Sequence, residues 1–225
     1  MKKIVRLAVF LAVAIFYQSI CSARISLPAT GNDNLLLQKS IGIPVKGTSS
    51  SGGIQRKQLF DDGWKFFLGD IPEASKNDFN DKDWRSLSLP HDWSIEGTIN
   101  PKNPTGGAGG YFPAGIGWYR KTFPVPGEWE GKHISIYFEG VYMNAEVFIN
   151  GKSLGIYPYG YTSFSYDLSP YLVFGEDNVI SVRVDNSQQI NSRWYSGSGI
   201  YRHVWMMVTE PVHVAQWGNV SIRAL

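Results

Sequence analysis

Residues 133–157 read HISIYFEGVYMNAEVFINGKSLGIY, and this stretch decides the fold. Apolar side chains occupy every second position in residues 133–139 and again in residues 145–150. A period of two with one apolar face predicts antiparallel β-strands that bury one side. Asn150-Gly151, directly before a third short run, predicts a two-residue hairpin turn. The stretch therefore predicts at least three sequential strands of an antiparallel sheet.

The same texture extends outward from this stretch in both directions. Runs of alternating or continuous apolar residues predict eight or nine strands between residues 57 and 209, with one helical turn at 169–172 and no long helix. Two packed antiparallel sheets in a jelly-roll-like β-sandwich are the simplest architecture, so the predicted fold class is all-β. The predicted strands are residues 57–60, 64–68, 86–89, 118–123, 133–139, 145–150, 153–157, 178–186 and 204–208.

Composition narrows the class of protein. The chain has 225 residues, 43% hydrophobic and 18% charged, which is typical of a globular protein rather than a disordered one. Its net charge of +2 is too small to indicate a nucleic-acid partner. The single cysteine, Cys21, rules out an internal disulfide and a cysteine-based metal site.

The N-terminus has the layout of a secretory signal. Three basic residues precede an apolar run at residues 7–16, which is too short to span a bilayer, and Cys21-Ser22-Ala23 offers small residues for cleavage. We predict a signal peptide over residues 1–23 and an exported protein that begins at Arg24. Lipidation of Cys21 is the alternative.

The remaining boundaries follow from composition. Residues 24–55, which include the Ser- and Gly-rich stretch 48–53, predict a flexible linker. Glu210-Pro211 marks the end of the domain at 56–210. The short alternating runs that follow predict that residues 211–225 begin a second β domain, since a strand alone cannot bury its face.

The sequence contains no recognisable catalytic centre. The four histidines lack metal-binding spacing, and neither a nucleophile elbow nor a phosphate-binding loop occurs. Glu139 and Glu146 flank a strand connection and are candidates for neighbours, but both fall on the polar parity of their strands, where solvated acids are the rule. We predict no catalytic residue, no metal and no cofactor for this chain.

Two loops combine aromatic side chains with hydrogen-bonding groups, at residues 89–118 and 185–202. Such mixtures bind sugars, because an aromatic face packs on C–H groups while polar side chains bond the hydroxyls. The competing interpretation is structural: Trp93 and Trp194 plug the end of the sandwich and Asp92 caps a turn. The residues alone favour neither interpretation.

Four ordered motifs resemble the N-terminal domain of family 2 glycoside hydrolases, above all secreted bacterial β-galactosidases. They are Pro90–Trp93, Gly115–Phe123, Phe138–Gly151 and Arg193–Arg202, and the resemblance covers about residues 56–210. It implies a galactose-binding-domain-like jelly roll, followed by an immunoglobulin-like domain and a catalytic (β/α)₈ barrel.

The resemblance also implies a function. In this family a retaining mechanism cleaves terminal β-glycosides with two glutamates of the barrel, so this chain alone is expected to be inactive. Its partners would be a carbohydrate and the barrel and immunoglobulin-like domain of the same polypeptide; no oligomeric state is predicted. The implied rim of the substrate pocket consists of His91, Asp92, Trp93, Asn191, Arg193, Trp194 and Tyr195.

Two positions depart from the best-known family member. Ala114 and Arg193 stand where that protein has an Asn and an Asp that touch the sugar. Arg193 leaves room for an acidic substrate, so a β-glucuronidase-like enzyme is an alternative within the family. A self-sufficient carbohydrate-binding module or lectin, and a purely structural spacer, are the alternatives from other classes.

Overall fold

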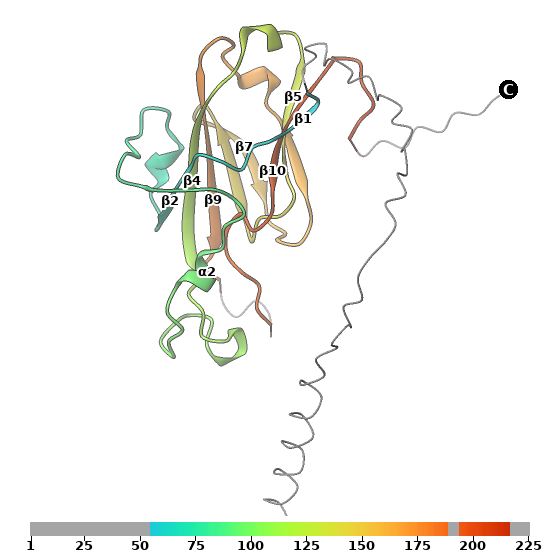
Figure 1. Cartoon of the computed structure of the whole chain (residues 1–225). Coiled ribbons are helices and arrows are strands. Elements are labelled where there is room, and N and C mark those ends of the chain that lie inside the picture. Colours follow the sequence, from blue (N-terminus) through green and yellow to red (C-terminus); the bar gives the residue numbers. More distant parts are fainter. Residues whose placement is uncertain (1–54, 189–193, 217–225) are drawn as a thin grey trace, which may run out of the picture. The chain divides into compact units, whose positions relative to one another are not determined.

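The computed structural model describes residues 55–188 and 194–216, which form two antiparallel sheets packed face to face (Figure 1). The four-stranded sheet has the order β1-β10-β5-β8 and the six-stranded sheet the order β3-β2-β4-β9-β6-β7. The predicted all-β sandwich is confirmed. The strands are β1 (Lys57–Leu59), β2 (Trp64–Leu68), β3 (Arg85–Leu87), β4 (Gly115–Pro124), β5 (His133–Phe138), β6 (Ala145–Ile149), β7 (Lys152–Tyr157), β8 (Phe164–Asp167), β9 (Asp177–Asn186) and β10 (Val204–Thr209).

The core lies between the sheets and follows the alternation of the deciding stretch. Ile134, Ile136 and Phe138 of β5 have no exposed surface, and neither have Val147 and Ile149 of β6. These side chains belong to one apolar cluster that both sheets share. Burial of this size is the main favourable term in folding, at roughly 25 cal/mol per Å² of apolar surface.

The predicted hairpin joins β6 to β7. Asn150 and Gly151 both have positive φ angles, 49° and 76°, as a type I′ turn requires. The Asn150 side chain also accepts a hydrogen bond from the Val179 N–H at 2.9 Å, which ties the turn to the neighbouring strand β9.

The structure differs from the prediction in three elements. Strand β8 was missed, because four residues are too few for a periodic signal, so the described residues hold ten strands. A single helical turn, α2 (Trp93–Glu96), was also missed. The described segment 210–216, where the alternating runs after Pro211 begin, contains no strand.

The outer face of the six-stranded sheet carries a second, smaller apolar cluster. Trp118 of β4 packs there with Ala74 and Trp84 from the connection between β2 and β3. That connection includes one of four short 3₁₀ turns, which are η1 (Pro72–Ser75), η2 (Gly107–Gly109), η3 (Gly127–Trp129) and η4 (Ser169–Tyr171). The six-stranded sheet is therefore covered on both faces, which the sequence pattern did not reveal.

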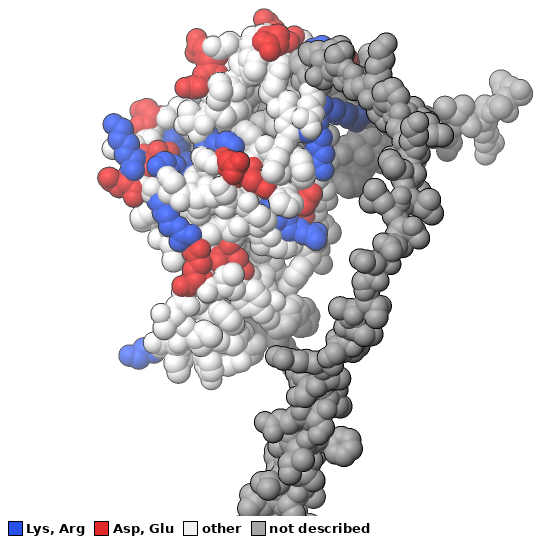
Figure 2. Space-filling model, viewed as in Figure 1, with Lys and Arg blue, Asp and Glu red and all other residues white. Residues whose placement is uncertain are grey.

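Charged side chains of both signs are scattered over the visible face, but the end that carries α2 and the following loop has few of them (Figure 2). Within the described residues, none of the helices has the length and apolar character needed to cross a membrane. The predicted signal peptide at 1–23 and nearly all of the predicted linker at 24–55 lie outside the described residues, as do residues 217–225.

Candidate functional site

Two distant loops meet at the α2 end of the sandwich. The His91 N–H donates to the Ile200 carbonyl at 2.8 Å, and the Trp93 N–H donates to the Ser198 carbonyl at 3.1 Å. Asp92 strengthens the junction, because its Oδ1 accepts from the Ser198 N–H at 2.8 Å as well as capping α2. The described parts of the two loops that sequence analysis singled out are therefore joined to each other.

Trp93 lies inside this junction, with 3% of its surface exposed. Its ring stacks on Phe66 of β2 at a centroid distance of 5.7 Å. Its indole nitrogen is the one buried side-chain polar atom among the described residues without a hydrogen-bond partner. This buried placement is the one that the structural interpretation, a plug at the end of the sandwich, predicts for Trp93.

His91 is also buried and stands at the centre of a polar network. Its Nδ1 lies 2.7 Å from the Tyr119 hydroxyl, and its Nε2 lies 3.2 Å from Glu96 Oε2. Arg85 forms a bidentate pair with Glu96, at 2.6 and 2.7 Å. The network fixes α2 against β4.

The charges of this network follow from its surroundings. The hydrogen bonds from Arg85 are the main cause that lowers the pKa of Glu96 to about 2, so this carboxylate is ionised at neutral pH. Burial lowers the pKa of His91, which keeps the imidazole neutral. Arg85 therefore supplies the positive partner of Glu96, and His91 orients the network rather than carrying charge.

Trp194 and Tyr195 are presented to solvent from the same junction, with 65% and 43% of their surfaces exposed. The Tyr195 hydroxyl donates a short hydrogen bond to Asp92 Oδ2, and its ring meets Phe112 edge-on at 4.8 Å. Burial and the Asp92 carboxylate raise the pKa of Tyr195, so the hydroxyl stays a donor. The Trp194 indole N–H donates to the Tyr161 hydroxyl at 3.1 Å.

Sequence reasoning missed the tyrosines beside Trp194. Tyr159 and Tyr161 are exposed, and the Tyr161 ring lies 5.6 Å from that of Tyr159 and 5.2 Å from that of Tyr142. The signal was available in residues 157–161, which read YPYGY. We call Tyr159, Tyr161, Trp194 and Tyr195 the aromatic edge.

Hollows of very different size flank the aromatic edge. Phe112, Trp194 and Tyr195 line one of about 20 Å³, too small for a sugar ring. On the other side, Tyr161 borders an open depression of about 470 Å³ with Glu139 and Arg202. The exposed aromatic faces thus adjoin one tight crevice and one open surface hollow.

The remaining predicted site residues and the candidate acids are placed as follows. Asn191 and Arg193 lie outside the described residues. Glu139 accepts from the Trp205 indole at 2.8 Å beside the four-stranded sheet, whereas Glu146 accepts from Ser153 on the six-stranded sheet. These two acids belong to different sheets and form no pair. Within residues 55–188 and 194–216, no group of three His, Cys, Asp or Glu could hold a metal ion.

Known proteins resemble the chain over this whole domain. The beta-galactosidase BoGH2A of Bacteroides ovatus is 60% identical over 176 residues, which cover 77% of this chain and 21% of that protein. A putative beta-glucuronidase of Formosa agariphila is 47% identical over 154 residues, 68% of this chain and 15% of that protein. The crystal structure of a beta-glycosidase from Bacteroides vulgatus superimposes with a TM-score of 0.69 at 52% identity, covering 72% of this chain and 21% of that one.

The chain thus spans about a fifth, or less, of the length of these relatives. Residues 58–211 match the family model of the glycosyl hydrolases family 2, sugar binding domain. That range begins in β1 and ends just after β10, so it contains both sheets and both loops of the junction. The chain belongs to glycosyl hydrolase family 2, of which it contains the sugar-binding domain.

Proposed function

We propose that this chain is the non-catalytic N-terminal part of an exported β-galactosidase-like glycoside hydrolase. In this proposal the aromatic edge forms one wall of the substrate entrance, and a catalytic barrel outside this chain supplies the acid and the nucleophile. The length of the relatives supports the missing barrel, and the separation of Glu139 from Glu146 agrees with chemistry located elsewhere.

The observation that carries the proposal is the anchoring of exposed aromatic rings on a buried scaffold. Tyr195 is tied to Asp92, Asp92 to the backbone of two loops, and Trp194 to Tyr161. Side chains held in place before binding lose little conformational entropy when a ligand packs on them. A sugar ring is such a ligand, because its C–H face packs on an aromatic plane.

The proposal predicts a binding defect when the aromatic edge is cut back in the whole enzyme. Trp194→Ala should raise KM for an aryl β-glycoside about fivefold and change kcat less than about twofold, because the ring binds substrate without touching the reacting atoms. Tyr171→Ala is the matched control, since Tyr171 is an exposed aromatic at the far end of the strands. An unchanged KM would favour the structural spacer.

The substrate class is proposed from the same edge. Relatives include a beta-galactosidase and a putative beta-glucuronidase. We favour a β-galactoside, with a β-glucuronide as the alternative that Arg193 suggests. Comparing kcat/KM of the whole enzyme on matched aryl β-galactoside and aryl β-glucuronide decides between them, and a higher value on the glucuronide would overturn the galactoside assignment.

A self-sufficient carbohydrate-binding module is the second candidate. The 470 Å³ depression beside Tyr161 favours it, since this volume falls within the roughly 300–1,000 Å³ range of small-ligand sites. Titration of the isolated chain with lactose distinguishes the two. A module should bind measurably and lose binding in Tyr161→Ala, whereas a rim-forming domain should bind weakly because most of its cavity is missing.

Export is part of the proposal. The basic start, the apolar run at 7–16 and the small residues at 21–23 support a signal peptide. The mass of the protein recovered outside the cytoplasm tests the proposed export. A chain that begins at Arg24 supports cleavage before that residue, and a chain that begins at a lipid-modified Cys21 supports membrane anchoring.

A further inference from the structure

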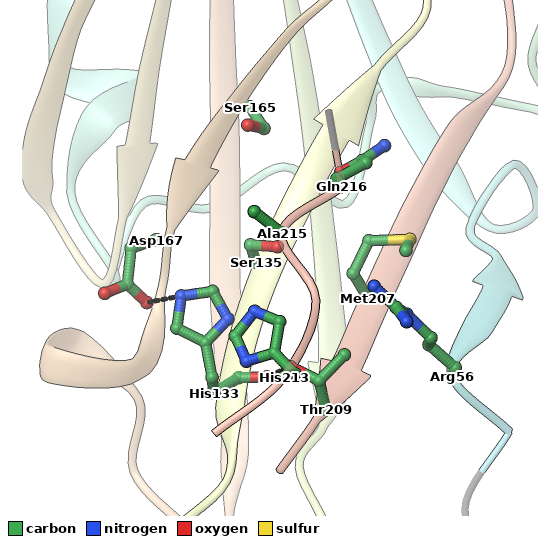
Figure 3. Close-up of a pocket in the computed structure, with 10 residues that line it drawn as sticks. All are labelled: Arg56, His133, Ser135, Ser165, Asp167, Met207, Thr209, His213, Ala215 and Gln216. Carbon is green, nitrogen blue, oxygen red and sulfur yellow. Dashed lines mark hydrogen bonds and ion pairs between the residues drawn. The ribbon is translucent and has the colours of Figure 1, made fainter. Parts of the chain in front are cut away.

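A second pocket lies on the outer face of the four-stranded sheet, away from the aromatic edge. Its volume is about 590 Å³, within the usual range of small-ligand sites. Figure 3 shows side chains from three neighbouring strands and from the segment after β10 directed into it. Nothing in the function proposed above uses this pocket.

The floor of the pocket is set by strand register. Ser135 of β5 lies opposite Met207 of β10 on one side and opposite Asp167 of β8 on the other. His133 lies opposite Thr209 one step further along the outer face. Outward-facing positions of adjacent antiparallel strands thus gather hydroxyl, imidazole, carboxylate and thioether groups on one surface.

The wall of the pocket is the segment 210–216, which is held in place by specific bonds. Arg56 donates to the Val214 carbonyl at 2.6 Å, and the His213 ring contacts the Glu210 carbonyl through Nδ1 at 2.7 Å. The His213 ring lies 4.8 Å from the His133 ring, and Figure 3 shows the two imidazoles side by side. The pocket, which stays open to solvent, is therefore bordered by two parts of the chain.

The lining leaves hydrogen-bonding capacity available. Neither the Ser135 nor the Ser165 hydroxyl has a hydrogen-bond partner among the residues that the structure describes. Asp167 accepts bonds from Ser169 through Oδ1 only, with His133 Nε2 at 3.8 Å from the same oxygen. Donors and acceptors that alternate over a few ångströms beside an apolar side chain suit a ring with several hydroxyls and C–H faces.

We propose that this pocket binds a pyranoside unit of a glycan. Hydroxyls of the sugar would bond Ser135, Ser165 and the free Asp167 oxygen, and its C–H face would pack on Met207 and the imidazoles. The site is separate from the aromatic edge, because His133 and Phe138 lie about 17 Å apart at opposite ends of β5. It would hold a glycan away from the place of cleavage, which goes beyond the rim role.

The test is a titration of the full chain with methyl β-galactoside and, separately, with methyl β-glucuronide, in which NMR chemical shifts report binding. Ser135→Val removes one hydroxyl at a strand position that tolerates valine, and we expect about a fivefold to tenfold loss of affinity. Ala215→Trp fills the pocket from the exposed segment without touching the sheet, and we expect it to abolish binding at this site. Ser86→Val is the matched control, an exposed strand serine on the other sheet.

Each outcome bears on the proposal. Binding that Ser135→Val and Ala215→Trp weaken, and that Ser86→Val and Trp194→Ala leave unchanged, supports a second sugar site. The proposal is overturned if neither glycoside binds, or if a glycoside binds and both pocket variants bind it as well as the unaltered chain does. Loss of binding in Trp194→Ala alone would assign the sugar to the aromatic edge, so failure of this proposal is distinguishable from failure of the rim proposal.

Discussion

At the scale of single residues, the same loop holds side chains with opposite tasks. His91 and Trp93 are neighbours of Asp92 in sequence, yet both are buried, while Asp92 reaches outward to Tyr195. In the proposed rim, the side chains left to face a ligand in this part of the described chain are Trp194 and Tyr195, which Asp92 holds in place through Tyr195. His91, Asp92 and Trp93 therefore all help to hold the two loops together, and the exposed rings of Trp194 and Tyr195 lie beside them.

Glu96 makes the stability of this network dependent on pH. Its folded-state pKa of about 2 lies below the ordinary value of 4.5, so stability is present above pH 4.5 and is lost as pH falls toward 2. The side chain is 40% exposed, so solvent screening reduces its contribution to about 1 kcal/mol. Burial lowers the pKa of His91, which adds a loss of stability in the same acid direction below 6.5.

Glu96→Gln should accordingly lower the free energy of unfolding at pH 7 by about 1 kcal/mol, and the difference from the unaltered protein should vanish near pH 2. Urea unfolding at several pH values measures it. Glu128→Gln, an exposed glutamate without an ion pair in the described chain, is the control. A difference that persists at pH 2 would show that Glu96 acts through something other than its charge.

Gly199 supports the junction through its backbone. Its φ of +120° is rare for other residues, and a Cβ there would lie 2.8 Å from the His91 carbonyl and still closer to the Tyr119 hydroxyl. We expect Gly199→Ala to destabilise the fold by about 3 kcal/mol, measured by urea unfolding.

The control for this substitution is Gly175→Ala. Gly175 also has a positive φ, of +79°, but no atom lies within 4 Å of the added Cβ, so only about 1 kcal/mol of backbone strain is expected. Equal losses at the two glycines would mean that the close packing under Gly199 contributes nothing.

At the scale of elements, the sequence predicted what depends on local periodicity. The strands of residues 133–157 and the Asn150-Gly151 turn are confirmed, because two-residue alternation and a positive-φ turn are local properties. Strand β8 and helix α2 were not predicted, because each is only four residues long and too short to show a periodic pattern. Of the aromatic edge, the sequence predicted Trp194 and Tyr195. Tyr161 was not predicted, because its contact with Trp194 joins residues 33 positions apart and depends on tertiary structure.

Arg120 illustrates what periodicity cannot reveal. It occupies an outward position of β4, where a charged residue indicates solvent, yet it is 1% exposed. Its guanidinium bonds Asp81 at 2.9 Å, the Lys76 carbonyl at 3.0 Å and Ser181 at 3.0 Å, and so holds the connection between β2 and β3 against the sheet. A pairing between residues 39 or more positions apart has no signature in local sequence.

At the scale of the whole molecule, the two candidate sites divide the sandwich between them. The aromatic edge lies at the α2 end, and the polar pocket lies on the outer face of the four-stranded sheet toward the other end of β5. Two recognition surfaces on one domain would let a hydrolase grip a glycan at one place and cleave it at another. In the proposed function the described residues contribute recognition, and the two candidate acids, Glu139 and Glu146, belong to different sheets.

The most direct measurement of this account is turnover of an aryl β-galactoside and an aryl β-glucuronide by the purified chain alone. The account predicts no release of the aryl group above the uncatalysed rate from either substrate, because the acid and the nucleophile lie in polypeptide outside residues 1–225. Turnover by this chain that exceeds the uncatalysed rate and disappears on heat denaturation would contradict it.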